Sequence, residues 1–136
     1  MGRIVALVIC LVLTACGGMS EDASAARVSV SDFRSYVSSG DHGAIYAMSD
    51  PLYRKTVTRQ QHDKLFSLLK KRMGDFDAAT ETGWKVNYTT EGEFVVLTYN
   101  ARFSKGEGAE TFTWKVTEGK PTLAGYNINS PALLAE

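Results

Sequence analysis

The chain begins with an apolar run, and its hydrophobic positions then follow first a helical and later a strand-like period. Residues 4–13 contain neither a charge nor a proline, and Arg3 stands just before them. A membrane-spanning helix needs about twenty apolar residues, whereas a shorter run of about ten is typical of the core of a signal peptide. A buried strand or helix is the alternative, but the N-terminal position and the small polar residues that follow favour the signal peptide.

Two short helices are expected first in the folded part of the chain. The pattern predicts a helix that Ser31 caps and Gly40 ends, because serine is a common N-cap and glycine a common C-terminal stop. A second helix is expected after Asp41, which is another capping residue. The pair Asp50-Pro51 should break this second helix, because proline disfavours the helical conformation of the residue before it.

A third helix is predicted most clearly, between Thr58 and Gly74. Thr58 and Gln61 have the spacing of a capping box, and Gly74 supplies the stop. Residues 70–72 are basic and fall in the last turn, where positive charge suits the helix dipole. The apolar positions recur at helical spacing and predict a stripe. That stripe consists of Leu65, Phe66, Leu68, Leu69 and Met73.

Apolar residues then recur at every second position, which is the period of a strand. The pattern predicts four strands, at residues 84–88, 93–103, 110–116 and 122–128. Short glycine-containing turns connect them, so consecutive strands should be antiparallel neighbours. The residues expected to share a face within their strands are Trp84, Val86 and Tyr88; Val95, Leu97, Tyr99, Ala101 and Phe103; and Phe112, Trp114 and Val116. Helices followed by this meander predict an α+β fold, with the N-terminal helices packed on one face of a curved antiparallel sheet.

The end of the apolar run indicates which type of signal peptide it is. Leu13-Thr14-Ala15-Cys16 resembles the bacterial lipobox, in which a leucine and two small residues precede a cysteine. The resemblance implies cleavage before Cys16, a thioether-linked diacylglycerol on its sulfur, and acylation of its amino group. The mature protein is therefore expected to contact the membrane through a lipid anchor.

This interpretation divides the chain into three parts. Residues 1–15 are the signal peptide, residues 16–27 are a lipidated flexible tether of small polar residues, and residues 28–136 are a single α+β domain. Gly17 stands where many Gram-negative lipoproteins carry an aspartate for inner-membrane retention. We therefore expect a bacterial cell-envelope protein, anchored at the periplasmic face of the outer membrane.

The two cysteines are both accounted for by the N-terminal segment. Cys10 lies in the signal peptide, and Cys16 carries the lipid. This assignment leaves the mature domain without a free thiol or a disulfide, and it excludes cysteine nucleophiles and cysteine-based metal sites.

Several stretches of the domain resemble a known family. The order of elements is that of the nuclear transport factor 2-like, or cystatin-like, cone. The segments SSGDHGAIYAMS, FSKGEGAETFTWKV and EGKPTLAGYNI are similar to a family of small bacterial envelope proteins of unknown function with this fold, and the similarity covers roughly residues 33–128. Members of that family often carry a tryptophan shortly before Gly125-Tyr126, where this chain has Pro121.

Cone folds of this type often hold a pocket between the sheet and the helices, and some members use it for catalysis. The candidate ligand-binding residues are aromatic: Tyr46, Tyr53, Tyr88, Tyr99 and Trp114. An enzyme resembling ketosteroid isomerase would place an aspartate base and a tyrosine donor in such a pocket, and Asp50 and Tyr126 are further candidates for these roles. The alternative is that the tyrosines pack the core, with their hydroxyl groups at its rim.

Other signatures of chemistry are weak. The chain has 15 basic and 15 acidic residues, and this balance argues against a nucleic-acid partner. His42 and His62 are its two histidines, which is fewer than the three or four ligands that a metal site needs. No Gly-x-Ser-x-Gly elbow occurs, and the glycines at 106 and 108 lack the lysine and helix of a phosphate loop. We expect no cofactor and no metal.

These observations favour a non-enzymatic binding domain, for a small apolar ligand or an envelope protein. Two alternatives remain open. One is an isomerase- or hydrolase-like enzyme that uses the cone pocket, and the other is an inhibitor or immunity lipoprotein. The oligomeric state does not follow from the sequence.

Overall fold

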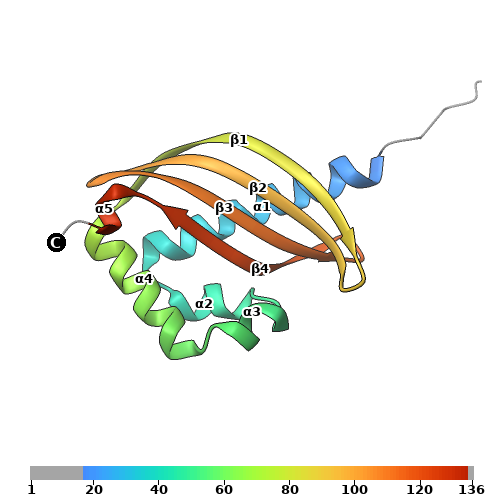
Figure 1. The fold of residues 1–136 in the computed structure, drawn as a ribbon, viewed down its shortest axis with the longest axis horizontal. Helices are drawn as coiled ribbons and strands as arrows, with labels where there is room; N and C mark the ends of the chain where they lie inside the picture. The colour runs from blue at the N-terminus through green and yellow to red at the C-terminus, as the bar shows by residue number, and fades with distance from the viewer. Residues whose placement is uncertain (1–16, 135–136) are drawn as a thin grey trace, which may run out of the picture.

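The computed structural model describes residues 17–134, and Figure 1 shows the order of their elements. The expected signal peptide at residues 1–15 and the expected lipid-bearing Cys16 lie outside the described residues. The helices and strands are α1 (Gly17–Ser39), α2 (His42–Ala47), α3 (Pro51–Thr56), α4 (Arg59–Met73), β1 (Phe76–Thr89), β2 (Gly92–Phe103), β3 (Gly106–Thr117), β4 (Lys120–Asn129) and α5 (Pro131–Leu134). The α+β class is confirmed.

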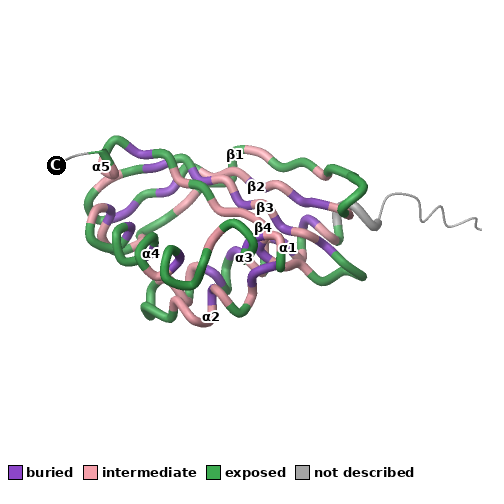
Figure 2. Tube along the Cα trace, turned by 60° about the horizontal axis from the view of Figure 1, so that its bottom comes forward, coloured by how far each residue is buried: buried purple, intermediate pink, exposed green. Residues whose placement is uncertain are grey.

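The four strands form one antiparallel sheet in the order β1-β2-β3-β4, as the turn pattern predicts. Figure 1 shows the sheet curving over α1, with α2, α3 and α4 beyond its β4 edge. The sheet therefore has an inner face, which faces α1, and an outer face. The alternation expected for β2 and β3 is confirmed, and Figure 2 shows buried positions along both strands. The buried inner-face residues are Val95, Leu97, Ala101, Phe103, Phe112, Trp114 and Val116.

Strand β1 begins earlier than the sequence predicts, at Phe76 instead of Trp84. It is an edge strand with two irregularities in its register, and most of its residues are exposed. An edge strand buries little on either face, so the first half of β1 shows only a weak alternation of apolar and polar residues. Trp84 and Tyr88 do share a face, opposite Leu97 and Glu93, but both of these aromatic side chains are exposed.

The helix caps follow the sequence closely. The Asp41 side chain accepts a hydrogen bond from the Ala44 backbone N–H at 3.0 Å, and both bonds of the Thr58–Gln61 capping box are present. Gly74 ends α4 with φ = 77°, and a Cβ atom there would meet the Ser104 hydroxyl, so the position requires glycine. Within the predicted apolar stripe of α4, Phe66, Leu69 and Met73 are buried, whereas Leu65 and Leu68 are exposed.

Helix α3 is absent from the sequence prediction, in which Asp50-Pro51 acts only as a break. Asp50 is the N-cap of α3, its side chain accepts from the Leu52 backbone N–H at 2.9 Å, and Pro51 occupies the first turn. Proline suits that position because the N–H group it lacks would have no partner within the helix. Asp50 and Pro51 thus follow the end of α2 and begin α3.

Helix α1 corrects the prediction of a tether. It begins at Gly17 and runs to Ser39, so Ser31 lies inside the helix and does not cap it. Ala23, Ala26, Val30 and Phe33 are buried at helical spacing. Small polar residues suggested a flexible linker, but the alanines let the helix approach the sheet closely. The flexible tether is therefore wrong for residues 17–27, and so is the domain boundary at residue 28.

The core centres on Phe33, which joins α1 to both other layers. Its ring centroid lies 5.0 Å from that of Phe112 on β3, 4.9 Å from Tyr126 on β4, and 5.7 Å from Phe66 on α4. Aromatic pairs at these separations add to the stability gained from burial alone. Within residues 17–134, no helix combines the length and the apolar composition that crossing a bilayer requires.

The packing of the first half of α1 can be tested with two glutamate substitutions. Ala26→Glu places a charge at a buried position and should lower the free energy of unfolding by about 3 kcal/mol or more. Ser24→Glu, two residues away at an exposed position, should change it by less than about 0.5 kcal/mol. Urea unfolding measures both, and equal, small effects would mean that these residues are a free tether after all.

Candidate functional site

A buried ion pair occupies the inner face of the sheet. Arg34 on α1 donates two hydrogen bonds to Glu110 on β3, at 2.9 and 3.3 Å, and the Tyr126 hydroxyl donates to the same carboxylate at 2.7 Å. The side chain of Glu110 is 1% exposed and that of Arg34 is 14% exposed. Burial and the neighbouring carboxylate raise the pKa of Tyr126 well above its ordinary value, so this tyrosine remains a donor.

Aromatic rings surround the guanidinium group of Arg34. Its central carbon lies 4.3 Å from the ring centroid of Phe76, 5.2 Å from that of Tyr99 and 5.5 Å from that of Phe112. Such contacts are attractive for a cation, the more so where water is excluded. The space left beside this cluster, between α1, α4 and the sheet, is about 10 Å³, which is room for about one water molecule. The region where a ligand pocket was expected is filled by side chains.

A second buried polar cluster joins α2, α3 and α4 around His62. The Nε2 atom of His62 lies 2.8 Å from the His42 carbonyl oxygen, and its Nδ1 atom lies 2.8 Å from the Tyr53 hydroxyl. A carbonyl can only accept, so Nε2 carries the proton and Nδ1 accepts from Tyr53. Burial lowers the pKa of His62 and raises the pKa of Tyr53 to about 12, so both groups are neutral near pH 7. Every polar atom of this pair has a partner, as expected for a cluster with a structural role. We call the hydrogen-bonded group of His62, Tyr53 and the His42 carbonyl the structural lock.

Asp50 is also fully engaged in the fold. Besides capping α3, its carboxylate accepts a hydrogen bond from the Thr122 hydroxyl at 2.8 Å. The backbone N–H of Asp50 donates to the Leu123 carbonyl, and the N–H of Leu123 donates to the Met48 carbonyl. These bonds hold the segment between α2 and α3 against β4. The Asp50 carboxylate is thus occupied by structural hydrogen bonds and is not placed to act as a general base in a pocket.

The aromatic residues predicted to bind a ligand do not line one pocket. Tyr46 and Tyr53 lie together beside His62, while Tyr99 contacts Arg34 on the inner face of the sheet. Trp114 is fully buried in the core, and Tyr88 is 66% exposed on the edge strand. Among the described residues, no group of three or more His, Cys, Asp or Glu side chains is placed to hold a metal ion.

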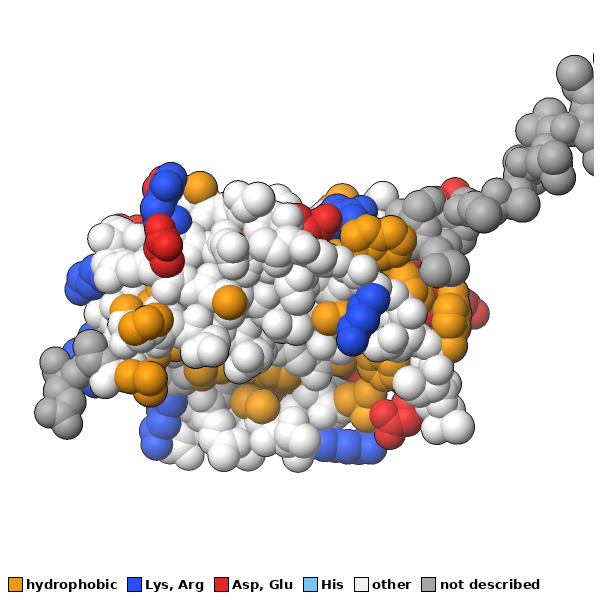
Figure 3. Space-filling model, turned by 45° about the horizontal axis from the view of Figure 1, so that its top comes forward, with side chains coloured by type: hydrophobic (Ala, Val, Ile, Leu, Met, Phe, Trp, Pro, Cys, Tyr) orange, Lys and Arg blue, Asp and Glu red, His pale blue; other side chains and the backbone are white. Residues whose placement is uncertain are grey.

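The outer face of the sheet carries a feature that the sequence reasoning missed. Two neighbouring rows of paired residues cross all four strands and contain no charged side chain. The first row is Thr80, Asn100, Ala109 and Asn129, and the second is Gly83, Thr98, Thr111 and Asn127. Figure 3 shows this side of the molecule as a broad, mostly white area with a few isolated hydrophobic side chains, and with charges toward its margins.

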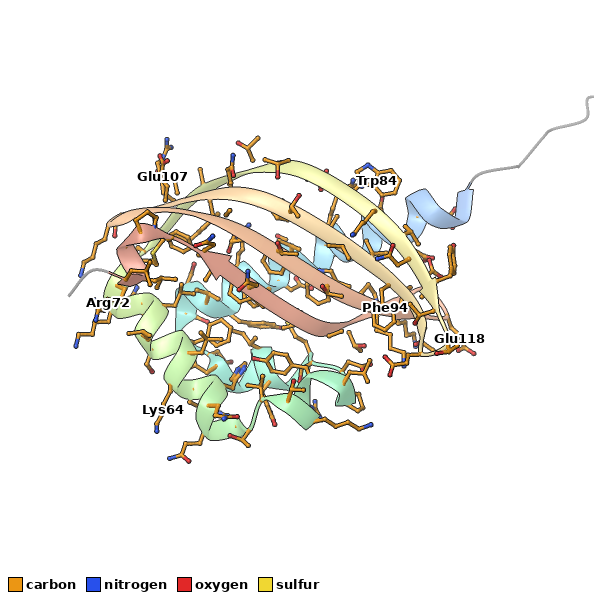
Figure 4. All side chains as sticks on the ribbon, viewed as in Figure 1. Lys64, Arg72, Trp84, Phe94, Glu107 and Glu118 are labelled. Carbon is orange, nitrogen blue, oxygen red and sulfur yellow. The ribbon has the colours of Figure 1, made fainter. Side chains whose placement is uncertain are left out.

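The first of these rows lies in a shallow groove of about 510 Å³. Small residues form its floor, and the rim includes Glu107 and Arg102, whose side chain is tied to Asp77 at 2.7 Å. Figure 4 places Glu107 at the opposite end of the sheet from Trp84, Phe94 and Glu118. The sequence feature that could have indicated this groove is the series of small polar residues at alternate positions of β2, β3 and β4. These residues form a groove only when the strands are aligned in their observed register.

The protonation of His62 gives a test of the structural lock. Because its pKa in the folded protein is below the unfolded value of about 6.5, the unfolded chain binds the proton first as the pH falls. Stability should therefore fall below about pH 6.5, by at most about 1.4 kcal/mol per pH unit. His62→Gln should remove this slope, and His42→Gln should keep it. Urea midpoints between about pH 7.5 and 5.5 measure it, and an unchanged slope in His62→Gln would contradict the assignment.

The comparison with known families identifies the domain but assigns it no activity. The family model described as "Protein of unknown function (DUF4019)" matches residues 30–126. That range begins in α1, ends in β4, and contains Arg34, Glu110 and Tyr126. No curated protein matches the chain at a significant level. Since the match covers well over half of the 136 residues, the chain belongs to the DUF4019 family of proteins of unknown function.

Proposed function

We propose that the protein is a membrane-anchored, non-enzymatic binding domain of the bacterial cell envelope, and that it binds its ligand on the outer face of the sheet. The lipobox-like sequence Leu13-Thr14-Ala15-Cys16 supports the anchor, and Gly17 after it favours the periplasmic face of the outer membrane. The curved sheet with helices on its inner face is consistent with a nuclear transport factor 2-like cone, and we propose that fold family for it.

The filled interior argues against two other functions. A small apolar ligand needs a cavity of several hundred Å³, whereas the space beside Arg34 and Glu110 is about 10 Å³. An isomerase- or hydrolase-like enzyme would need a polar group that faces substrate. Glu110 and Tyr126 bind each other, Glu110 also binds Arg34, and His62 binds Tyr53 and a backbone carbonyl. Both arguments direct attention to the surface.

The observation that carries the proposal is the groove of about 510 Å³ on the outer face, together with the two rows there that contain no charged side chain. Solvent-exposed sheet faces usually carry charged side chains among the polar ones, because charges keep a protein soluble. The two rows described above offer only hydroxyl, amide and methyl groups. Asparagine and threonine side chains can each donate and accept hydrogen bonds. The surface therefore suits an uncharged ligand with many groups of both kinds.

A neutral glycan has this chemistry more than a protein partner does. Energetically dominant residues of protein interfaces are mostly tryptophan, tyrosine and arginine, and the two rows contain none of them. The hydroxyl and acetamido groups of an N-acetylated amino sugar match the donors and acceptors of Asn100 and Asn129. We therefore propose that the groove binds a neutral glycan chain of the cell envelope.

Substitutions on β3 test this function. Ala109 lies between Asn100 and Asn129 in the groove, so Ala109→Glu should fill it with a charged side chain. We expect the variant to bind a soluble N-acetylglucosamine tetramer at least about tenfold more weakly, a loss of about 1.4 kcal/mol. Thr117→Glu, at an exposed position near the other end of the same strand, is the matched control.

Isothermal titration of the full chain in mild detergent measures the affinity. The wild type and Thr117→Glu should bind equally. Absence of binding at millimolar tetramer would contradict a glycan ligand. Recovery of a protein by cross-linking at Asn100 would then show that the groove binds a protein instead of a glycan. Binding that Ala109→Glu leaves unchanged would contradict the groove as the site.

A further inference from the structure

Two exposed aromatic side chains stand out on the edge strand. Trp84 is 47% exposed and Tyr88 is 66% exposed, and neither belongs to the core or to the groove. Both side chains have an apolar ring and a polar group, which is the composition that favours the boundary between lipid and water. Figure 3 shows hydrophobic side chains gathered at the end of the molecule where α1 begins.

Contacts with α1 fix the height of these side chains along the helix. The Arg27 guanidinium lies 5.8 Å from the ring centroid of Trp84 and binds the Glu81 carboxylate at 2.7 Å. Further along β1, Tyr88 pairs with Glu93 of β2. Burial and the neighbouring Asp22 carboxylate of α1 raise the pKa of Glu93. Trp84 is thus level with Arg27. Tyr88 lies four residues, or about 13 Å, further along β1 toward the end where α1 begins (Figure 1), which brings it near the level of Asp22.

These heights bring the aromatic residues close to the proposed anchor. Cys16 directly precedes Gly17, the first residue of α1. A helix rises 1.5 Å per residue, so Asp22 is about 8 Å and Arg27 about 15 Å along the axis from Gly17. The headgroup region on each side of a bilayer is roughly 5–8 Å thick. Tyr88 can therefore reach it directly when Cys16 is anchored, and Trp84 can reach it when α1 lies obliquely.

We infer that Trp84 and Tyr88 form a membrane seat, which inserts into the headgroup region beside the lipid anchor and fixes the orientation of the domain. This inference rests on the proposed lipidation of Cys16. The helix α1 supports this inference, because a flexible tether would let the domain tumble, whereas α1 holds the seat at a set distance from Gly17, the residue that follows Cys16 in the sequence.

The charges around the membrane seat indicate which lipid it contacts. The acidic residues at this end of the molecule outnumber the unpaired basic ones. They are Glu21, Asp22, Glu91, Glu93 and Glu118, against Lys85, Lys115 and Lys120, while Arg27 is bound to Glu81. Clusters of basic residues are what draw proteins to anionic lipid. The seat therefore depends on its aromatic side chains, and zwitterionic phospholipid is sufficient for it.

The seat would also determine which way the groove faces. Thr80 in the groove is eight residues from Tyr88 along β1, a separation of about 26 Å. Figure 4 likewise places Trp84 and Glu107 at opposite ends of the sheet. A domain seated through Trp84 and Tyr88 would hold the groove away from the bilayer, toward the interior of the envelope.

Tryptophan fluorescence can test the seat, because the chain has two tryptophans and the other, Trp114, is fully buried. The full chain is expressed in a lipoprotein-processing bacterium and extracted from its membranes, and its intact mass is measured for cleavage before Cys16 and for lipid. It is then reconstituted in vesicles of phosphatidylethanolamine and phosphatidylcholine that carry bromine atoms close to the headgroups. Trp84→Phe, which keeps only the buried Trp114, is the matched control.

We expect the bromine atoms to quench the emission that Trp84 supplies and to leave Trp84→Phe unquenched. Tyr88→Ser should reduce the quenching, and added phosphatidylglycerol should not increase it. A lipidated protein whose Trp84 stays unquenched would overturn the seat and leave the anchor intact. A membrane-extracted product without lipid would overturn the proposed anchor and the seat together.

Discussion

The ion pair between Arg34 and Glu110 is the interaction on which the rest of the structure depends. It joins the C-terminal half of α1 to the third strand, and Tyr126 of the fourth strand completes it. Removing one partner of such a buried pair leaves the other charge without compensation, which typically costs about 3–5 kcal/mol. Because the pair and its surrounding rings fill the inner face, the space between sheet and helices is part of the core. The proposed binding function therefore relies on a surface.

The continuity of α1 links this core to the N-terminus. The helix that supplies Arg34 runs without a break from Gly17, so one helix joins the buried centre of the domain to the residue that follows the proposed lipid anchor in the sequence. Under the proposed lipidation, such an arrangement would give the domain a defined height and tilt above a membrane. In the proposed function, the groove on the outer face and the aromatic residues at the hairpin end have separate roles, one for ligand and one for lipid.

Much of the fold could be predicted because several elements carry strong local signals. The capping box at Thr58, the stop at Gly74 and the alternation along β2 and β3 all specified their elements correctly. The first half of α1 could not be predicted in this way, since Ala23 and Ala26 look like linker residues until a sheet is packed against them. Arg34 and Glu110 are 76 residues apart, and no local pattern pairs them. The groove depends equally on strand register, which places Asn100, Ala109 and Asn129 side by side.

The most direct measurement of the central claim is a double-mutant cycle of unfolding free energies on the ion pair. It compares the wild type, Arg34→Met, Glu110→Gln and the variant with both changes. If the pair closes the core, each single variant should be less stable than the wild type. The double variant should be at least as stable as the less stable single variant, and the coupling energy should exceed about 1.5 kcal/mol. Additive effects, with a coupling below about 0.5 kcal/mol, would contradict the account and reopen the inner face as a binding site.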